Sequence, residues 1–410
     1  MLAPGVRQAR PGGGSRVSEP LELIYLTPSR MAVERTPTRS ASLLTALLER
    51  EEIGRVTVLN RLRPTEVPAR LRATRPERTP SLMALASALP GGRSPDDRIL
   101  EHPWPFGAAE DRFVERLAQA TTASATADAG VVLWVADPKS ASVFDALAGR
   151  RSRPLLVFDA FDAWDLSPLV TGRRRLRAVT AGYAAAARSA DIIFANTPAM
   201  AQRFASLGAR SVHLLPNASP SARAFQPDPA PYVVYVGRVH ERFDAPLVTA
   251  VARALPDLEV RIAGPVVHPP VGWDVLAACA NVHLLGSVPG PQALALMGGS
   301  RAVLVPHLPD DYTRSQDSMK AWDAIAVGAP VISTGVPPVS EWRDRPGLGR
   351  VADDAAGFIA AIRDALASDS PADRSARRAF AQENGWAARA ADVARVLVPM
   401  VADLGHGGHP

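Results

Sequence analysis

The chain has 410 residues, of which 47% are hydrophobic and 21% are charged, so it can bury a sizeable core and is not expected to be disordered as a whole. Its length predicts two domains, each with a core of its own. No apolar run approaches the roughly 20 residues that a membrane-spanning helix needs. The single cysteine, Cys279, excludes an intrachain disulfide and is typical of a protein of the reducing cytoplasm.

Positive charge is concentrated in the first half of the chain. Residues 1–230 carry a net charge of +8 and residues 231–410 a net charge of −3. The basic half favours an anionic partner, such as an anionic membrane surface, and its densest cluster, Arg173–Arg177, has the charge to bind lipid phosphates. The other interpretation is an arginine-rich composition with a solvated helix face, since 44 of the 46 basic residues are Arg. Nucleic acid is not expected, because the basic residues are not interleaved with aromatic ones.

The first half of the chain alternates between apolar runs and amphipathic segments. Residues 1–20 lack the hydrophobic segment of a signal peptide, so we expect a disordered tail and a cytoplasmic location. Strands are predicted at 21–27, 55–60, 98–102, 131–136, 155–159, 191–195 and 212–215. Helices are predicted at 39–50, 111–125, 172–189 and 198–207. This alternation predicts a parallel sheet in a Rossmann-like domain over residues 21–218, with 61–98 as an irregular segment.

Residues 219–231 are rich in Pro, Ser and Ala and are predicted to be a linker, after which the alternation begins again. Strands are predicted at 232–236, 260–263, 282–285, 302–305 and 331–333, followed by helices at 354–367 and 372–404. Residues 232–375 therefore form a second Rossmann-like domain. Neither domain carries the Gly-x-Gly-x-x-Gly fingerprint or a Walker loop, which favours a nucleotide-sugar enzyme over a dehydrogenase.

The segment Val303–Val336 has the most informative pattern, namely strand, polar loop, short helix, stop and strand. Asp317 or Ser318 is placed to cap the helix, and a Gly-Ala-Pro sequence ends it. In a parallel sheet such a helix begins at the ligand-binding edge and presents free N–H groups that favour a phosphate. Lys320 and Asp323 share one face of the helix, so the ammonium can contact a diphosphate and the carboxylate a ribose. The alternative is a surface ion pair worth about 0.2–0.5 kcal/mol.

The sequence from Asp317 to Thr334 resembles the donor-binding motif of GT-B glycosyltransferases of family 4, and within it the teichuronic-acid-biosynthesis subgroup. The resemblance implies two Rossmann-like domains that face each other across a cleft, with a C-terminal helix, 376–404, crossing back to the first. It also implies that Asp323, which stands where the family has Glu, hydrogen-bonds the donor ribose. Ser315 replaces a second Glu that contacts the sugar. Thr313, Ser315 and Ser318 are therefore candidate donor-binding residues.

A second stretch, Tyr235–Arg242, is similar to the family's Gly-Arg-Leu-x-x-x-Lys-Gly segment, although it is one residue shorter. By this resemblance Arg238 and Arg242 bind the donor diphosphate, because a guanidinium fork suits phosphate oxygens. Gly237 would let the backbone approach the ligand closely. The alternative is an exposed turn in which the two arginines pair with the neighbouring carboxylates, Glu241 and Asp244.

The first domain carries a similar, less complete match. The stretch Asp159–Asp165 ends a buried strand and is similar to the subgroup's D-x-x-D-D-W segment. Asp162 is the candidate on the acceptor side, where a carboxylate can orient an acceptor hydroxyl or take its proton. Asp159 and Asp165 are equally well explained as capping or loop-anchoring residues. His102 and His307 are alternative candidates, although a single histidine is more often structural.

These patterns predict a glycosyltransferase, of hexosyltransferase type, that needs no cofactor besides a nucleotide-diphosphate sugar as co-substrate. No metal-ligand spacing is present, so Arg238, Lys320 and the helix amino end are expected to offset the leaving-group charge. The resemblance implies retention at the anomeric carbon and a polysaccharide, glycolipid or small-molecule acceptor. One alternative is a non-catalytic scaffold or regulatory subunit, which Ser315 and Asp323 in place of Glu keep open. Another is a sugar-nucleotide epimerase, disfavoured because no acid/base set for it is found.

Overall fold

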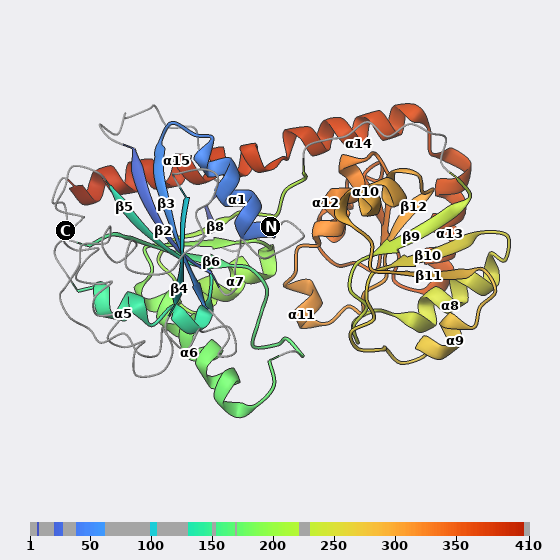
Figure 1. Ribbon diagram of the computed structural model, residues 1–410, viewed down its shortest axis with the longest axis horizontal. Helices are drawn as coiled ribbons and strands as arrows, with labels where there is room; N and C mark the ends of the chain where they lie inside the picture. The colour runs from blue at the N-terminus through green and yellow to red at the C-terminus, as the bar shows by residue number, and fades with distance from the viewer. Residues whose placement is uncertain are drawn as a thin grey trace. The chain divides into compact units, whose positions relative to one another are not determined.

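The computed structural model describes residues 6–7, 20–27, 38–61, 99–104, 130–149, 153–168, 170–220 and 230–405. The chain divides into two compact units, each built around one parallel sheet (Figure 1). The first unit comprises Met1–Leu215 and Arg389–Pro410, and the second comprises Pro216–Ala388. The predicted helix at 111–125 and nearly all of the irregular segment lie outside the described residues.

The first unit holds an eight-stranded sheet within the described residues, in the order β1-β8-β7-β6-β5-β2-β3-β4. Its strands are β1 (Val6–Arg7), β2 (Leu21–Thr27), β3 (Ile53–Arg61), β4 (Ile99–Trp104), β5 (Val131–Val135), β6 (Leu155–Ala160), β7 (Ile192–Ala195) and β8 (Val212–Leu214). All neighbours pair in parallel, as the apolar runs predict. β1 is a two-residue strand inside the segment expected to be a disordered tail.

Helices of the first unit pack on the sheet through its alternating apolar side chains. They are α1 (Arg39–Leu48), the 3-10 turn η3 (Pro138–Ser140), α5 (Val143–Leu147), α6 (Arg173–Ser189), α7 (Pro198–Ser206) and, from Arg389 on, α15 (Trp386–Gly405). Ile24, Leu133 and Phe158 belong to the buried cluster that α5, α6 and α7 complete. Gly182 of α6 lies against η3 so closely that a Cβ there would be 1.7 Å from the Pro138 carbonyl oxygen.

The second unit contains a six-stranded parallel sheet in the order β11-β10-β9-β12-β13-β14. Its strands are β9 (Tyr232–Val236), β10 (Glu259–Ala263), β11 (Val282–Gly286), β12 (Ala302–Val305), β13 (Val331–Ser333) and β14 (Gly349–Val351). Numbered along the unit, this is the doubly wound order 3-2-1-4-5-6. The order in which successive strands are added therefore reverses between β9 and β12, and such sheets bind ligands at this switch point.

Both faces of this second sheet are covered, because alternate residues of each strand point to opposite sides. Val233 and Tyr235 pack into one core and Tyr232 and Val234 into another. The helices are α8 (Ala245–Ala254), α9 (Trp273–Ala277), α10 (Gly290–Gly298), α11 (Asp311–Arg314), α12 (Met319–Ala326), the 3-10 turn η4 (Val339–Trp342), α13 (Ala355–Ser368) and α14 (Pro371–Glu383). Trp322 on α12 is buried against Trp342 and Phe380.

The chain ends in two helices where the sequence predicts one over 372–404. α14 ends at Glu383 and α15 begins at Trp386, with Asn384 as the C-cap and Gly385 between them. Gly and Asn are the residues that most readily end a helix, so the break has a local cause. Within the described part of the chain, no helix is long and apolar enough to cross a membrane.

Candidate functional site

The candidate site of the second unit lies at the carboxyl ends of β9 and β12, on either side of the switch point. The loop after β9 is tied to the loop after β12 by two backbone hydrogen bonds. Asp244 donates from its N–H to the Pro306 carbonyl (2.8 Å), and Leu308 donates to the Arg242 carbonyl (2.8 Å). These bonds fix the position of both loops in front of the sheet edge where α12 begins.

Five side chains gather at this edge, and we refer to them as the Lys320 cluster: Tyr235, Arg242, His307, Lys320 and Asp323. Lys320 lies in the first turn of α12. Its Nζ is 3.5 Å from His307 Nε2 and 4.9 Å from the centre of the Tyr235 ring. The ammonium is thus placed against two neutral rings, and no described carboxylate lies within ion-pair distance of it.

Gly237 makes room for this lysine. A Cβ at Gly237 would lie 3.0 Å from Lys320 Cε and 3.2 Å from its Nζ. The residue also has a φ of 144°, which side chains other than glycine's rarely adopt. The immediate neighbour of the Gly237 backbone is therefore the lysine side chain, and the predicted close approach to a ligand stays a prediction.

Burial shifts the pKa values of the two charged residues of α12 in opposite directions. The pKa of Lys320 falls from its ordinary value to about 7, because burial disfavours the ammonium and the nearby Arg242 repels it. The pKa of Asp323 rises to about 7, because burial disfavours the carboxylate. The positive charge of Lys320 opposes this rise. Both residues are partly buried.

Two members of the cluster carry no charge near neutral pH. Burial lowers the pKa of His307 well below its ordinary value, and the positive charge of Lys320 lowers it further. Burial raises the pKa of Tyr235 to about 12, and its hydroxyl donates to the Arg238 carbonyl at 2.9 Å. The positive charge of the cluster therefore comes from Lys320 and Arg242 alone.

The two arginines of the loop after β9 are placed differently. Arg242 donates from Nη1 to Gln316 Oε1 at 2.5 Å, and its buried Nε has no partner among the described residues. Arg238 is exposed. In the described structure neither arginine pairs with Glu241 or Asp244. Asp244 instead caps α8 by accepting from the Leu247 N–H.

The predicted donor-binding hydroxyls of Thr313 and Ser315 are engaged within their own loop. Thr313 completes a capping box with Asp310 at the start of α11 and also donates to the Leu308 carbonyl at 2.7 Å. Ser315 donates to the Tyr312 carbonyl at 2.6 Å. Both residues are buried, so they hold the loop that leads into α12.

At the amino end of α12 the two candidate caps have separate roles. Ser318 is the N-cap residue, but its side chain makes no capping bond, and its buried Oγ has no partner among the described residues. Asp317 accepts from the Asn217 N–H at 2.6 Å and from Trp322 Nε1 at 2.8 Å. Asp317 thereby anchors residues that follow β8, while the Ser318 hydroxyl is left beside the first helical turn.

The sequence assigned no role to three neighbours of the site, Gln316, Tyr235 and Asn217. Gln316 belongs to the polar loop before α12, and Tyr235 is the residue before the last of β9, where the alternation of the strand places it on a core face. The contact of Asn217 with Asp317 spans 100 residues. No local pattern in the sequence predicts a contact of that separation.

The acceptor-side candidate, Asp162, belongs to the first unit and follows β6. It has a φ of 58°, the one positive value at a residue other than glycine in the described part of the chain. The Tyr183 hydroxyl donates to its carbonyl at 2.9 Å. A left-handed backbone at a non-glycine residue costs about 1–3 kcal/mol and is frequent at functional sites.

The two aspartates on either side of Asp162 form ion pairs, as expected of loop anchors. Asp159 accepts from Arg39 Nη2 at 2.9 Å, with both side chains buried. Asp165 accepts from both terminal nitrogens of Arg203, at 2.5 and 2.8 Å. Asp162 therefore has a strained backbone and lies between two aspartates that are held by ion pairs.

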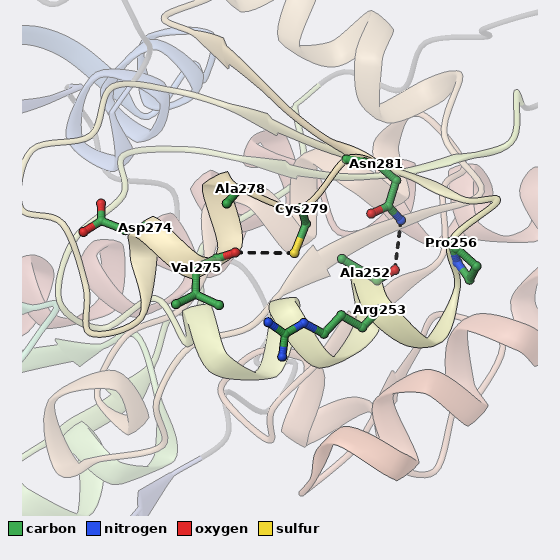
Figure 2. A pocket seen from close by; sticks show the side chains of 9 residues that line it. Ala252, Arg253, Pro256, Asp274, Val275, Ala278, Cys279 and Asn281 are labelled. Atoms are coloured by element: carbon green, nitrogen blue, oxygen red, sulfur yellow. Dashed lines mark hydrogen bonds between the residues drawn. The ribbon is translucent and has the colours of Figure 1, made fainter.

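A surface hollow of about 600 Å³ lies at the opposite edge of the second sheet (Figure 2). Its lining comes from the ends of α8 and α9 and from the loops before β10 and β11, at the amino ends of the strands. Asn281 there donates to the Ala252 carbonyl at 3.0 Å, and Cys279 donates to the Val275 carbonyl at 3.4 Å. These polar groups donate to backbone carbonyls nearby. The hollow lies at the amino ends of the strands, whereas the Lys320 cluster lies at their carboxyl ends.

Comparison with known proteins covers mainly the second unit at the level of sequence. Residues 242–395 match the family model described as "Glycosyl transferase-like". This range includes Arg242, His307, Lys320 and Asp323. No curated protein sequence matches the chain.

Similarity to solved structures extends over nearly the whole chain. HepE from Anabaena, crystallised with UDP, is 14% identical, covers 92% of this chain and 100% of its own, and superposes with a TM-score of 0.65. Sucrose-phosphate synthase from Thermosynechococcus elongatus is 15% identical, covers 93% and 99%, and gives 0.66. A trehalose-phosphate synthase from Burkholderia vietnamiensis is 14% identical, covers 93% and 99%, and gives 0.59. The chain has the fold of these proteins, which confirms the predicted GT-B class of two Rossmann-like domains.

Proposed function

We propose that this chain is a glycosyltransferase that moves a sugar from a nucleoside-diphosphate donor to an acceptor hydroxyl. The observation that carries the proposal is Lys320, a partly accessible cation in the first turn of α12 at the switch point of the second sheet. Arg242 adds a second cation, and the lack of a side chain at Gly237 leaves room for the ammonium. A site with two cations and no paired carboxylate suits an anionic ligand.

The donor would bind with its diphosphate against the amino end of α12. The unpartnered Ser318 hydroxyl and the first-turn N–H groups would hydrogen-bond phosphate oxygens beside Lys320. Asp323 lies one turn further along the same face, where its carboxyl group would accept from the ribose hydroxyls. Uridine is the first base to test, because the similar HepE structures contain UDP and UDP-glucose.

During transfer, the bond between the anomeric carbon and the diphosphate oxygen breaks and the acceptor oxygen forms the new bond. Negative charge grows on the departing diphosphate, and Lys320, Arg242 and the exposed Arg238 would stabilise it without a metal ion. The acceptor proton would pass to the departing phosphate or to the Asp162 carboxylate. Retention at the anomeric carbon is proposed on the family resemblance of the motif from Asp317 to Thr334.

Calorimetric titration with UDP, GDP and ADP, followed by a donor hydrolysis assay, tests the proposal. We expect one of the nucleotides to bind and the corresponding nucleotide sugar to be hydrolysed slowly in the absence of acceptor. If no nucleoside diphosphate binds to the folded protein, the proposed activity is wrong.

A non-catalytic GT-B scaffold is the second candidate, and one observation favours it. Ser315 stands where the resembling family has Glu, and its hydroxyl is used by the Tyr312 carbonyl. The usual carboxylate contact with the donor sugar therefore has no replacement at this position. Nucleotide binding without hydrolysis or transfer over a broad panel of acceptors would support the scaffold.

A further inference from the structure

The amino-terminal part of α6 carries a dense positive charge and is not covered by the rest of the described first unit. Residues 171–178 are all exposed, and Val179 is the first buried residue of the helix. In Figure 1, α6 is the green helix at the lower edge of its unit. Four arginines lie in this part of the helix, Arg173, Arg174, Arg175 and Arg177, while residues 166–178 include no acidic residue.

Interactions within the first unit do not explain why arginine occupies these four positions. None of the four forms an ion pair or a side-chain hydrogen bond with another described residue. Three of them occupy the first turn, where the helix dipole disfavours positive charge, and Gly172 provides no side-chain cap. The helix would be more stable with acidic residues at these positions, so its own folding does not explain the sequence.

Exposed leucines accompany the arginines. Leu176 lies three residues before Val179 and seven before Tyr183, and thus continues the buried stripe of α6, yet it is 41% exposed. Leu166, in the loop that leads to the helix, is 48% exposed. Apolar side chains among unpaired cations are the pattern of a helix that lies at a membrane interface.

We propose that Leu166 and residues 173–177 form a docking surface for a bilayer that contains anionic phospholipids. The arginines bind the lipid phosphates, and the leucines enter the boundary between headgroups and acyl chains. The surface belongs to the first unit, whereas the Lys320 cluster belongs to the second. The inference therefore does not depend on the proposed glycosyl transfer.

Charge and shape favour a lipid surface over other anions. Consecutive residues of a helix point about 100° apart, so the first three arginines spread around the helix and fit an extended sheet of phosphates. Residues 171–178 include no aromatic side chain on which a nucleic-acid base could stack. An acidic peptide would match the charge but would leave the leucines without a function.

Sedimentation of the full chain with vesicles tests the proposal. The vesicles are made of phosphatidylcholine alone or mixed with phosphatidylglycerol. We expect binding to the mixed vesicles only, weakened by added salt. Because each basic residue near such a surface contributes about fivefold in affinity, replacing the four arginines with glutamine should weaken binding by about 100-fold or more. Adding Leu176→Ser to this variant should weaken binding to the mixed vesicles further.

A matched variant removes the same charge elsewhere. Glutamine at four other exposed positions, Arg210, Arg253, Arg343 and Arg363, should leave vesicle binding within about twofold of the original protein, and thermal unfolding verifies that both variants fold. The proposal is overturned if the original protein does not bind mixed vesicles, or if both variants lose binding equally. Binding of poly-glutamate but not of vesicles, lost in the α6 variant, would identify a protein partner and also overturn it.

Discussion

Lys320 and Asp323 lie one helical turn apart, and burial brings their pKa values together until both are about 7. In the free protein the lysine is therefore only partly charged at neutral pH. An anion bound beside it would stabilise the ammonium and raise its pKa. Binding of the donor is thus expected to be coupled to the uptake of a proton.

We predict that UDP affinity falls as the pH rises above about 7. The free protein loses the Lys320 proton there while the complex keeps it, so affinity decreases by up to about tenfold per pH unit. Calorimetry at pH 8 in two buffers of different ionisation enthalpy should reveal proton uptake on binding. Lys320→Met should abolish it, and the same uptake in that variant would assign the proton to another group.

Replacing Asp323 with alanine tests the ribose assignment. We expect donor binding to weaken by about 1–3 kcal/mol, because ribose hydroxyls lose their acceptor in a partly buried site. Titration with UDP gives the affinity, and Asp257→Ala, at an exposed position of the same unit, is the control. Unchanged affinity in the Asp323 variant would remove its carboxylate from the donor site.

At single positions, the sequence predicts the residues whose role is set by neighbours along the chain. Lys320 and Asp323 share a helix face because they are three residues apart. The surroundings that shift their pKa values come from β9 and β12, and the partners of Asp317 lie at Asn217 and Trp322. Such contacts depend on the tertiary fold. Of the two residues expected to cap α12, Ser318 is the N-cap residue and Asp317 is an anchor.

At the scale of elements, the loop after β9 is shaped by two glycines in contact. A Cβ at Gly264 would lie 2.0 Å from the Gly237 carbonyl oxygen, and both residues have φ near 145°. The ends of β9 and β10 can therefore approach each other closely. This packing brings Gly237 against the Lys320 side chain.

Gly237→Ala is predicted to weaken UDP binding by about tenfold or more, since the methyl group displaces the Lys320 side chain and strains the backbone. We also expect a loss of about 1–3 kcal/mol in the free energy of unfolding. Titration and denaturant unfolding measure the two effects. Gly290→Ala is the control, because a Cβ there meets no other atom within 4 Å. Donor binding unchanged in the Gly237 variant would contradict the placement of the ligand beside this loop.

Strands are the elements that the sequence predicts best. Tyr232–Val236 and Ala302–Val305 have the predicted bounds, because their apolar runs end at Gly or Pro. The short β14 and α11 were not predicted, since three or four residues carry too little periodicity. The break between α14 and α15 was also missed, although Asn384 and Gly385 provide a local signal for it.

The whole molecule consists of two units whose buried cores are separate. The first unit contains the buried Arg39–Asp159 ion pair, to which Tyr25 contributes a hydrogen bond at 3.4 Å. The Lys320 cluster belongs entirely to the second unit. Damage to one unit should therefore leave the local structure of the other intact.

Asp159→Ala is predicted to destabilise the first unit by about 3–5 kcal/mol, because Arg39 would be left buried without its partner. UDP affinity should stay within about twofold below the unfolding temperature, since the ligand contacts the second unit. Unfolding followed by Trp fluorescence and titration of the folded variant measure both. A large loss of UDP affinity in the folded variant would show that donor binding depends on the first unit.

The most direct test of the account compares UDP with uridine in the original protein and in Lys320→Met. If the diphosphate rests against the amino end of α12, UDP should bind the original protein about tenfold or more tighter than uridine, and most of that difference should disappear in the variant. The same preference for UDP in both proteins would contradict the account, because the diphosphate would then be held elsewhere.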